Sequence, residues 1–358
     1  MRESELKDFY KGKRVLITGH TGFKGTWLTV FLKELGAKVC GYSLPLSSYC
    51  FYHDVAPSIE MHVEGDIADI DRVLRTVETF RPEIIIHLAS HSSLDRSTEI
   101  PDYIFKTNLM GVVNLMEAVR KTSFVKAVVV VTSDKCYQDR GTTIPYKEQD
   151  LLGAVDPYST SKVGQELLTA CYMNTFFNEK KVGIATARAS NVIGAGDYNI
   201  SRLMPYLLDC YSRGDVPRIR NPLAVRPWQY VLDVLYGYLL LAKKLYETSE
   251  KTIEYNGAYN FGPNNDGFIT VEELSKLVGM NFGKNTFKIC NQEEYFIKET
   301  NVLKLDSTKA KETLGWQTKI SLGDAVKLTV DYVQLQKEGK RTSGELCREH
   351  ITKYMNFI

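Results

Sequence analysis

The sequence has little net charge and no long hydrophobic run. Its 45 lysine and arginine residues nearly balance 43 aspartate and glutamate residues, which leaves a formal net charge of +2. So small an excess provides no broad electrostatic field for nucleic acid or a membrane surface. No stretch reaches the roughly 18 apolar residues that a membrane helix needs, and the N-terminal stretch has no apolar core followed by a cleavage site. We therefore expect a cytoplasmic protein that binds neither nucleic acid nor membrane.

Paired cysteines are missing as well. The seven cysteines are odd in number and scattered, and none forms a C-x-x-C motif or stands beside paired histidines. A reduced intracellular compartment fits this usage best, and we predict no metal site. Because 44% of the 358 residues are hydrophobic, the chain can bury a large core, enough for two domains or for one domain with a substantial lobe.

What the sequence does contain is an alternation of short apolar runs with helical patterns. The alternation predicts an α/β fold of the Rossmann type, with a doubly wound parallel sheet whose strands are covered on both faces. A smaller mixed α/β lobe should follow and close over the carboxyl edge of the sheet, from which at least one strand and a helix could return to it. The apolar runs lie at 14–18, 38–42, 61–64, 83–88, 126–131 and 183–188, and the helical patterns at 24–35, 70–80, 103–121 and 158–177.

The first run meets a glycine motif, Gly19-His20-Thr21-Gly22-Phe23-Lys24-Gly25, which opens the first helix. Glycine lets the backbone turn sharply and approach a pyrophosphate, whose charge is met by unpaired amides at the start of the helix. A purely structural turn is the alternative. We predict an NAD-binding Rossmann domain at 1–190 and a mainly substrate-binding lobe at 191–358. The expected contacts of the motif with the cofactor are Gly19, Thr21, Gly22, Phe23, Lys24 and Gly25.

The second strand ends Gly41-Tyr42-Ser43 without the carboxylate that often binds the ribose of NAD. No arginine or lysine follows nearby to meet a 2′-phosphate either, so the sequence favours NAD over NADP. Asp66 and Ile67, after the third strand, are candidates to cap the adenine, although Asp66 could also be an ordinary turn residue. Leu88 and Ala89, after the fourth strand, are further candidates for cofactor binding.

A tyrosine and a lysine stand four residues apart in Tyr158-Ser159-Thr160-Ser161-Lys162, where positions i and i+4 share a helix face. The pKa of tyrosine is too high for a base at neutral pH, and a neighbouring ammonium favours the phenolate. The pair can then take a proton from a sugar hydroxyl while hydride leaves the same carbon. A solvated surface pair is the alternative. Ser133 and Asp134 follow the fifth strand at the ligand-binding edge of the sheet.

Taken together, the glycine motif, Asn108, Ser133 and the Tyr158–Lys162 pair resemble the extended short-chain dehydrogenase/reductase family. More narrowly, the segments GHTGFKG, VTSDKCY, DPYSTSK, RASNVIGAGD and IRNPLAVRPWQYV resemble the CDP-glucose 4,6-dehydratases. The similarity runs from about residue 11 to residue 306 and so covers most of the chain. It implies that Asn108, Tyr158 and Lys162 also contact the cofactor.

The resemblance implies a reaction in which bound NAD oxidises the sugar at carbon 4, water leaves across carbons 5 and 6, and the hydride returns to carbon 6. Elimination needs a base for the proton on carbon 5 and an acid for the departing hydroxyl. We expect Asp134 to be the acid, Lys135 the candidate base, and Ser133 a hydrogen-bond partner of the oxygen on carbon 4. Epimerases of this superfamily need no such acid-base pair, so the presence of Asp134-Lys135 favours a dehydratase over an epimerase. A salt bridge at the strand end is the alternative.

For the diphosphate of a nucleotide sugar the first candidate is Arg226, whose planar fork suits phosphate. Asn191, Arg220, Arg202 and Ser92 are further candidates. The segment 91–97 resembles the dTDP-glucose 4,6-dehydratases more than the CDP-glucose enzymes, so the nucleotide or sugar could differ. A dehydratase of another hexose (dTDP or GDP), an epimerase and a non-catalytic NAD-binding scaffold remain alternatives. The helices at 103–121 and 158–177 are those through which this superfamily commonly dimerises, so we expect a homodimer or a pair of dimers.

Overall fold

The computed structural model describes residues 3–46, 50–92, 95–177, 179–284, 286–290 and 302–357. Its centre is a seven-stranded sheet with the order β10-β6-β5-β4-β1-β2-β3, in which every neighbouring pair is parallel. The direction of winding reverses beside β1, which confirms the doubly wound fold predicted from the alternation. The strands are β1 (Arg14–Thr18), β2 (Lys38–Ser43), β3 (Met61–Glu64), β4 (Ile84–His87), β5 (Ala127–Val131), β6 (Gly183–Ala189) and β10 (Gly257–Phe261).

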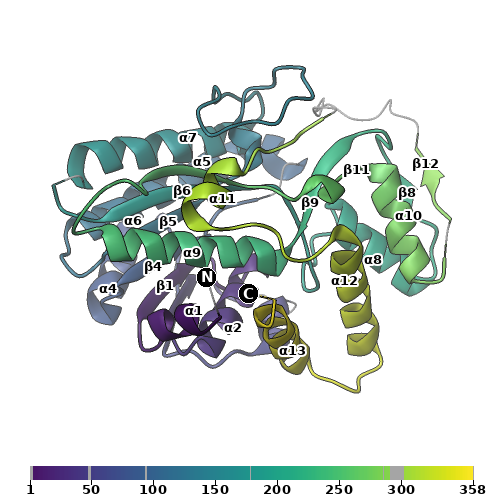
Figure 1. The fold of residues 1–358 in the computed structure, drawn as a ribbon, viewed down its shortest axis with the longest axis horizontal. Helices are drawn as coiled ribbons and strands as arrows, with labels where there is room; N and C mark the ends of the chain where they lie inside the picture. Colours follow the sequence, from purple (N-terminus) through teal and green to yellow (C-terminus); the bar gives the residue numbers. More distant parts are fainter. Residues whose placement is uncertain are drawn as a thin grey trace.

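Helices cover both faces of this sheet (Figure 1). Along β4, Ile84 and Ile86 belong to one core cluster, while Ile85 between them belongs to the other. Successive side chains of a strand point to opposite faces, so an unbroken apolar run is buried only if both faces are covered. One face packs against α2 (Phe23–Glu34) and α9 (Val231–Thr248), and the other against α4 (Ile70–Phe80), α6 (Gly111–Arg120) and α7 (Pro157–Tyr172).

Two of the expected helices are interrupted by wider turns. The pattern at 103–121 is α5 (Pro101–Phe105), then a π-helical turn at Lys106–Met110, then α6. The pattern at 158–177 is α7 followed by a second π-helical turn at Met173–Phe177. Such turns share the periodicity of a helix closely enough that the sequence pattern runs through them.

The second half of the chain forms a smaller part at one end of the sheet, on the right in Figure 1. It also places β10 beside β6 and packs α9 against β4, β5 and β6. The domain boundary at residue 190 stays a prediction. This part contains a three-stranded sheet of β7 (Asn191–Ile193), β9 (Val225–Tyr230) and β11 (Phe268–Thr270), the pair β8 (Arg218–Ile219) and β12 (Lys288–Ile289), and the helices α8 (Leu203–Arg213) and α10 (Val271–Asn281).

Four further helices complete the core, together with the short α3 (Phe51–Val55). Helix α13 (Ser343–Met355) packs against α2 and α3, on the same face of the sheet as the first helix. Within the described part of the chain, no helix combines the length and the apolar character required to cross a bilayer. The four are α1 (Glu3–Tyr10), α11 (Thr308–Leu314), α12 (Leu322–Lys337) and α13 (Ser343–Met355).

Candidate active site

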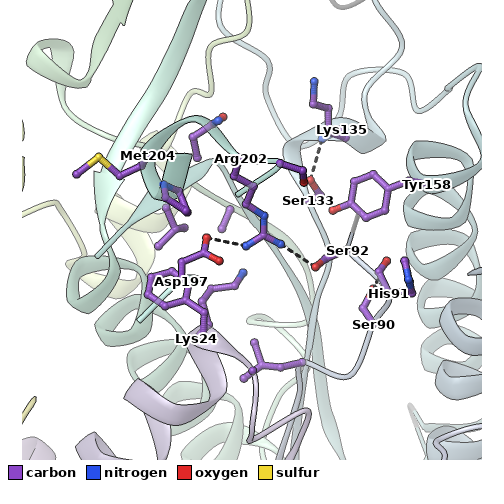
Figure 2. A pocket seen from close by; sticks show the side chains of 18 of the residues that line it. Lys24, Ser90, His91, Ser92, Ser133, Lys135, Tyr158, Asp197, Arg202 and Met204 are labelled. Carbon is purple, nitrogen blue, oxygen red and sulfur yellow. Dashed lines mark hydrogen bonds and ion pairs between the residues drawn. The ribbon is translucent and has the colours of Figure 1, made fainter. Parts of the chain in front are cut away.

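A cavity of about 1490 Å³ opens at the carboxyl ends of the parallel strands. Its wall combines the loops after β1, β4 and β5, the first turn of α7, and residues of β7, α8, β8 and β9. Side chains from both halves of the chain therefore face one another across a single space (Figure 2). With one exception, every predicted site residue belongs to this wall.

The exception is Asn108, which lies behind the wall and is fully buried. Its Nδ2 donates to the Ser161 hydroxyl at 2.8 Å and to the carbonyl of His91 at 3.1 Å, and its Oδ1 accepts from the backbone N of His91 at 2.8 Å. Asn108 therefore holds the loop after β4 against α7. The structure places it as a support for the wall, and its direct contact with the cofactor stays a prediction.

The glycine turn is as tight as the motif predicts. Gly19 has a φ of +73°, and a Cβ there would come within 2.7 Å of the backbone N of Ala89. A Cβ on Gly25 would lie 2.1 Å from the carbonyl oxygen of Gly19. Helix α2 begins after Gly22, and no side chain caps its first turn. The backbone amides of that turn therefore remain available for an anionic group, which fits a pyrophosphate.

At the other end of this strip, Asp66 and Ile67 line the cavity beside Ser43 at the end of β2. The Asp66 carboxylate accepts from the backbone N of Ala68 at 2.9 Å, and its carbonyl accepts from the Tyr42 hydroxyl at 2.8 Å. Sequence reasoning missed Ser43 as a site residue. The signal was its position, since it stands where a ribose-binding carboxylate often ends the second strand.

Tyr158 lies in the first turn of α7, which begins sharply because Asp156 caps it and accepts from the backbone N of Ser159 at 2.8 Å. Figure 2 shows its hydroxyl turned toward Ser133. Burial raises the pKa of Tyr158 to about 12, against the opposing effects of its hydrogen bond with Ser133 and of the Arg202 guanidinium. The tyrosine and serine are thus brought together from two separate elements, as the prediction requires.

Lys162 is buried one turn further along α7. Its Nζ donates to the Ser90 hydroxyl at 2.8 Å and to Gln165 Oε1 at 2.9 Å, and it lies 5.8 Å from the centre of the Tyr158 ring. Burial, followed by the charge of Lys24, lowers the pKa of Lys162 to about 7. The expectation that the charge of Lys162 favours the phenolate of Tyr158 stays a prediction.

Asp134 is 4% exposed, and its Oδ2 is buried without a hydrogen-bond partner among the described residues. Its Oδ1 accepts from the Ser133 hydroxyl at 3.1 Å. Burial raises the pKa of this carboxyl, although Lys135, Ser133 and Arg226 act in the opposite direction. A raised pKa favours the protonated form of a carboxyl, so Asp134 beside Ser133 is suited to act as an acid.

Lys135 also lines the cavity, but its side chain points away from the Tyr158 hydroxyl (Figure 2). Its backbone N donates to the Ser133 hydroxyl at 3.2 Å. Its role as a base stays a prediction.

Among the described residues, no group of three or more histidine, cysteine, aspartate and glutamate side chains could hold a metal ion.

On the substrate side, Arg202 crosses the cavity. Its Nη1 lies 2.8 Å from Asp197 Oδ2, and its Nη2 donates to the Ser92 hydroxyl at 2.7 Å (Figure 2). Sequence reasoning missed Asp197, although it lies inside the segment RASNVIGAGD. Residues 93 and 94 of the segment that resembles the dTDP-glucose enzymes lie outside the described residues.

The other predicted substrate contacts take three positions around the same space. Arg226 is 5% exposed on β9, Arg220 is exposed after β8, and Asn191 begins β7. A buried guanidinium beside a cavity favours an anionic ligand more strongly than an exposed one, because water screens it less.

Comparison with known proteins places this fold and site in a known class. A family described as GDP-mannose 4,6 dehydratase matches residues 16–329, and the chain belongs to this family. It is 38% identical to the CDP-glucose 4,6-dehydratase of Salmonella typhimurium, over 89% of this chain and 90% of that protein. It is 27% identical to GDP-mannose 4,6 dehydratase 1 of Arabidopsis thaliana, over 90% of this chain and 91% of that protein.

Solved structures agree. The UDP-glucose 4-epimerase of Thermotoga maritima with UDP-glucose is 26% identical, with a TM-score of 0.79, over 90% of this chain and 99% of that one. The dTDP-glucose 4,6-dehydratase of Bacillus anthracis in complex with NAD shares the fold, with 21% identity and a TM-score of 0.77, over 91% and 98% of the two chains. Dehydratases and epimerases thus share this architecture, so the site residues must discriminate between them.

Proposed function

We propose that this chain is an NAD-dependent nucleotide-sugar 4,6-dehydratase that converts CDP-glucose to CDP-4-keto-6-deoxyglucose. The observation that carries the proposal is Asp134, a buried carboxyl with a raised pKa beside Ser133 and Tyr158. Among the side chains of the site, oxidation at carbon 4 needs only Tyr158, Lys162 and Ser133. The loss of water also requires a proton donor in the same space, which an epimerase does not need.

NAD fits the strip of wall from the glycine turn to Asp66. The glycine turn leaves the first amides of α2 without a side-chain cap and so available to a pyrophosphate, and Asp66 and Ile67 line the far end. Lys162 and Ser90 would meet the cofactor where the strip reaches the catalytic groups. When bound, the cofactor accepts a hydride from carbon 4 and returns it to carbon 6.

The residues of the chain then divide the proton transfers among them. Tyr158, assisted by Ser133, takes the proton from the hydroxyl on carbon 4 as that carbon is oxidised. The new ketone acidifies the proton on carbon 5, which Lys135 removes. Asp134 gives its proton to the departing hydroxyl on carbon 6, and water leaves. As carbon 6 is reduced, Lys135 gives its proton back to carbon 5. Because the product keeps the ketone on carbon 4, Tyr158 then releases its proton to water and Asp134 takes one up, which restores the enzyme after each turnover.

CDP-glucose is the substrate we favour, because the relative that shares 38% identity bears that name. Arg226, Arg220 and Asn191 would hold its diphosphate. Ser92 belongs to the segment 91–97, which resembles the dTDP-glucose enzymes, and Arg202 donates to its hydroxyl. A dTDP- or GDP-hexose is therefore the second candidate.

We also propose a homodimer, or a pair of dimers, formed through α5, α6 and α7. Exposed apolar side chains on α7 and on the π-helical turns that follow α5 and α7 support it, since Leu167, Met110 and Phe176 are 59%, 44% and 40% exposed. We further propose a cytoplasmic enzyme, with a cofactor domain at 1–190 and a mainly sugar-binding lobe at 191–358.

The decisive experiment is incubation of the purified protein and NAD with CDP-, dTDP-, GDP- and UDP-hexoses, followed by mass spectrometry of the products. A 4-keto-6-deoxy product, lighter than its substrate by one water, supports the dehydratase, and the preferred nucleotide identifies the substrate. A product isomeric with its substrate would establish an epimerase. Binding of NAD without any turnover would establish the scaffold.

A further inference from the structure

A buried ion pair lies behind the cavity, between Glu166 of α7 and Arg188 of β6. The side chains are each 4% exposed, and Arg188 Nη2 lies 2.8 Å from Glu166 Oε2. Neither residue belongs to the cavity wall formed by the described residues. Burying two charges is costly unless further hydrogen bonds satisfy them, so their partners indicate what the pair is for.

Those partners come from several separate elements. The Thr132 hydroxyl at the end of β5 donates to Glu166 Oε1, and the Thr186 hydroxyl of β6 donates to Oε2 at 2.8 Å. Arg188 Nη1 donates to the Tyr137 hydroxyl at 2.8 Å and to the backbone carbonyl of Glu148 at 3.0 Å. The ion pair therefore joins β5, β6, α7 and the loop that follows the short 3-10 helix Asp134–Cys136.

Two of these connections lead directly to the catalytic groups. Glu166 lies on α7 two turns beyond Tyr158, and Thr132 immediately precedes Ser133. One carboxylate thus touches both the helix that carries the tyrosine and the strand end that carries the serine. Because these elements are distant in the sequence, their spacing has to be set by such a long-range contact.

We propose that Glu166, held by Arg188, is a positioning residue that sets the distance between the Tyr158 hydroxyl and Ser133. This inference rests on the proposed function, since it assigns to the pair a part in the same proton transfer. The carboxylate reaches the reacting atoms only through Thr132 and α7. A displacement of about 1 Å between reacting groups is enough to lower the rate about a hundredfold. A rigid buried contact that prevents such a displacement therefore keeps the rate high.

The charge of Glu166 also acts on Lys162. Burial and Lys24 lower the pKa of this lysine, and Glu166 opposes them. A neutral glutamine at position 166 would therefore lower the pKa of Lys162 further. If activity requires a protonated Lys162, the alkaline limb of the pH profile moves to lower pH in Glu166→Gln, a readout that a purely structural role would not change.

A matched pair of variants separates positioning from stability. Thr132→Val and Thr186→Val each remove one hydroxyl that donates to the same carboxylate, and the two threonines are 5% and 4% exposed. In Thr132→Val we expect the single-turnover reduction of NAD by the sugar nucleotide to slow at least about tenfold, with KM changed less than about twofold. Thr186→Val should lose a similar amount of thermal stability and keep a rate within about twofold of the wild type.

Equal slowing by the two threonine variants would overturn the positioning role, as would a rate of NAD reduction in Glu166→Gln equal to that of the wild type. If Thr132→Val does not fold, the rate of Glu166→Gln decides alone. A wild-type protein that turns over no sugar nucleotide would overturn the proposed function itself. That outcome is seen before any variant is made, so the two failures are distinguishable.

Discussion

The Lys162 ammonium donates to the Ser90 hydroxyl at 2.8 Å and lies 5.8 Å from the centre of the Tyr158 ring. The tyrosine hydroxyl pairs with Ser133 instead, and burial raises its pKa to about 12. In this geometry the phenol keeps its proton at neutral pH. A cation close to the phenol oxygen would favour the phenolate and so allow Tyr158 to act as a base.

Replacing Tyr158 with phenylalanine should abolish the oxidation step, because Ser133 alone cannot take the proton from the sugar. We expect a loss of about 10²- to 10⁴-fold in the rate of NAD reduction, the usual contribution of a general base. Single-turnover formation of NADH measures it, with an unchanged thermal midpoint as the control for folding. A variant that still reduces bound NAD would contradict the assignment.

Asp134→Asn should separate the two halves of the reaction. An amide cannot donate the proton that the departing hydroxyl needs, so dehydration should slow by about 10²-fold or more. Hydride exchange at carbon 4 should fall much less, because Tyr158 and Ser133 remain. Release of deuterium label from carbon 4, compared with formation of the 4-keto-6-deoxy product, measures both steps. Equal losses in the two would refute the role of Asp134 as an acid.

Two glycine variants should separate the contribution of this turn to the stability of the fold from its contribution to NAD binding. A Cβ at position 25 would lie 2.1 Å from the carbonyl of Gly19, whereas a Cβ at position 22 would lie 3.4 Å from the same atom. Gly25→Ala should therefore destabilise the fold itself, by about 1–3 kcal/mol from overpacking. Gly22→Ala should fold normally and bind NAD more weakly, because a glycine in such a turn lets the backbone approach the pyrophosphate closely.

Chemical denaturation and NAD titration of both variants check this. Unchanged NAD affinity in Gly22→Ala would show that the pyrophosphate does not lie against this turn.

Asp233 at the start of α9 should make stability depend on pH. It is fully buried and accepts from the backbone N of Lys319 at 2.7 Å and from the Tyr354 hydroxyl at 2.8 Å, yet burial raises its pKa to about 7. Between about pH 4 and 7 the unfolded chain loses this proton while the folded chain keeps it. The contribution of Asp233 to stability therefore falls as pH rises through that window and is constant above it.

The free energy of unfolding of the wild type and of Asp233→Asn, measured by denaturant titration at several pH values, tests this. Asparagine does not titrate, so the advantage of the wild type should shrink between pH 4 and 7, by up to about 4 kcal/mol. A difference that stays constant over this range would show that Asp233 is ionised throughout in the folded protein.

The sequence was sufficient for whatever depends on neighbouring residues. The three glycines from Gly19 to Gly25 follow a strand and open a helix, so the turn was predictable in detail. Tyr158 and Lys162 share a face because a helix repeats every 3.6 residues. Likewise, the unbroken apolar run of β4 indicated a sheet covered on both faces, and the structure confirms it.

Only the tertiary structure decided which distant groups meet. Asn108 supports the wall from behind, Lys162 bonds to Ser90, and Arg202 bridges Asp197 and Ser92. None of these contacts has a local signature. Packing of the helices against the sheet sets each of them, and it brings together residues that lie up to about a hundred positions apart in the chain. The order of residues thus determines the turn, the helix face and the sheet, whereas the chemistry of the site depends on how these elements pack.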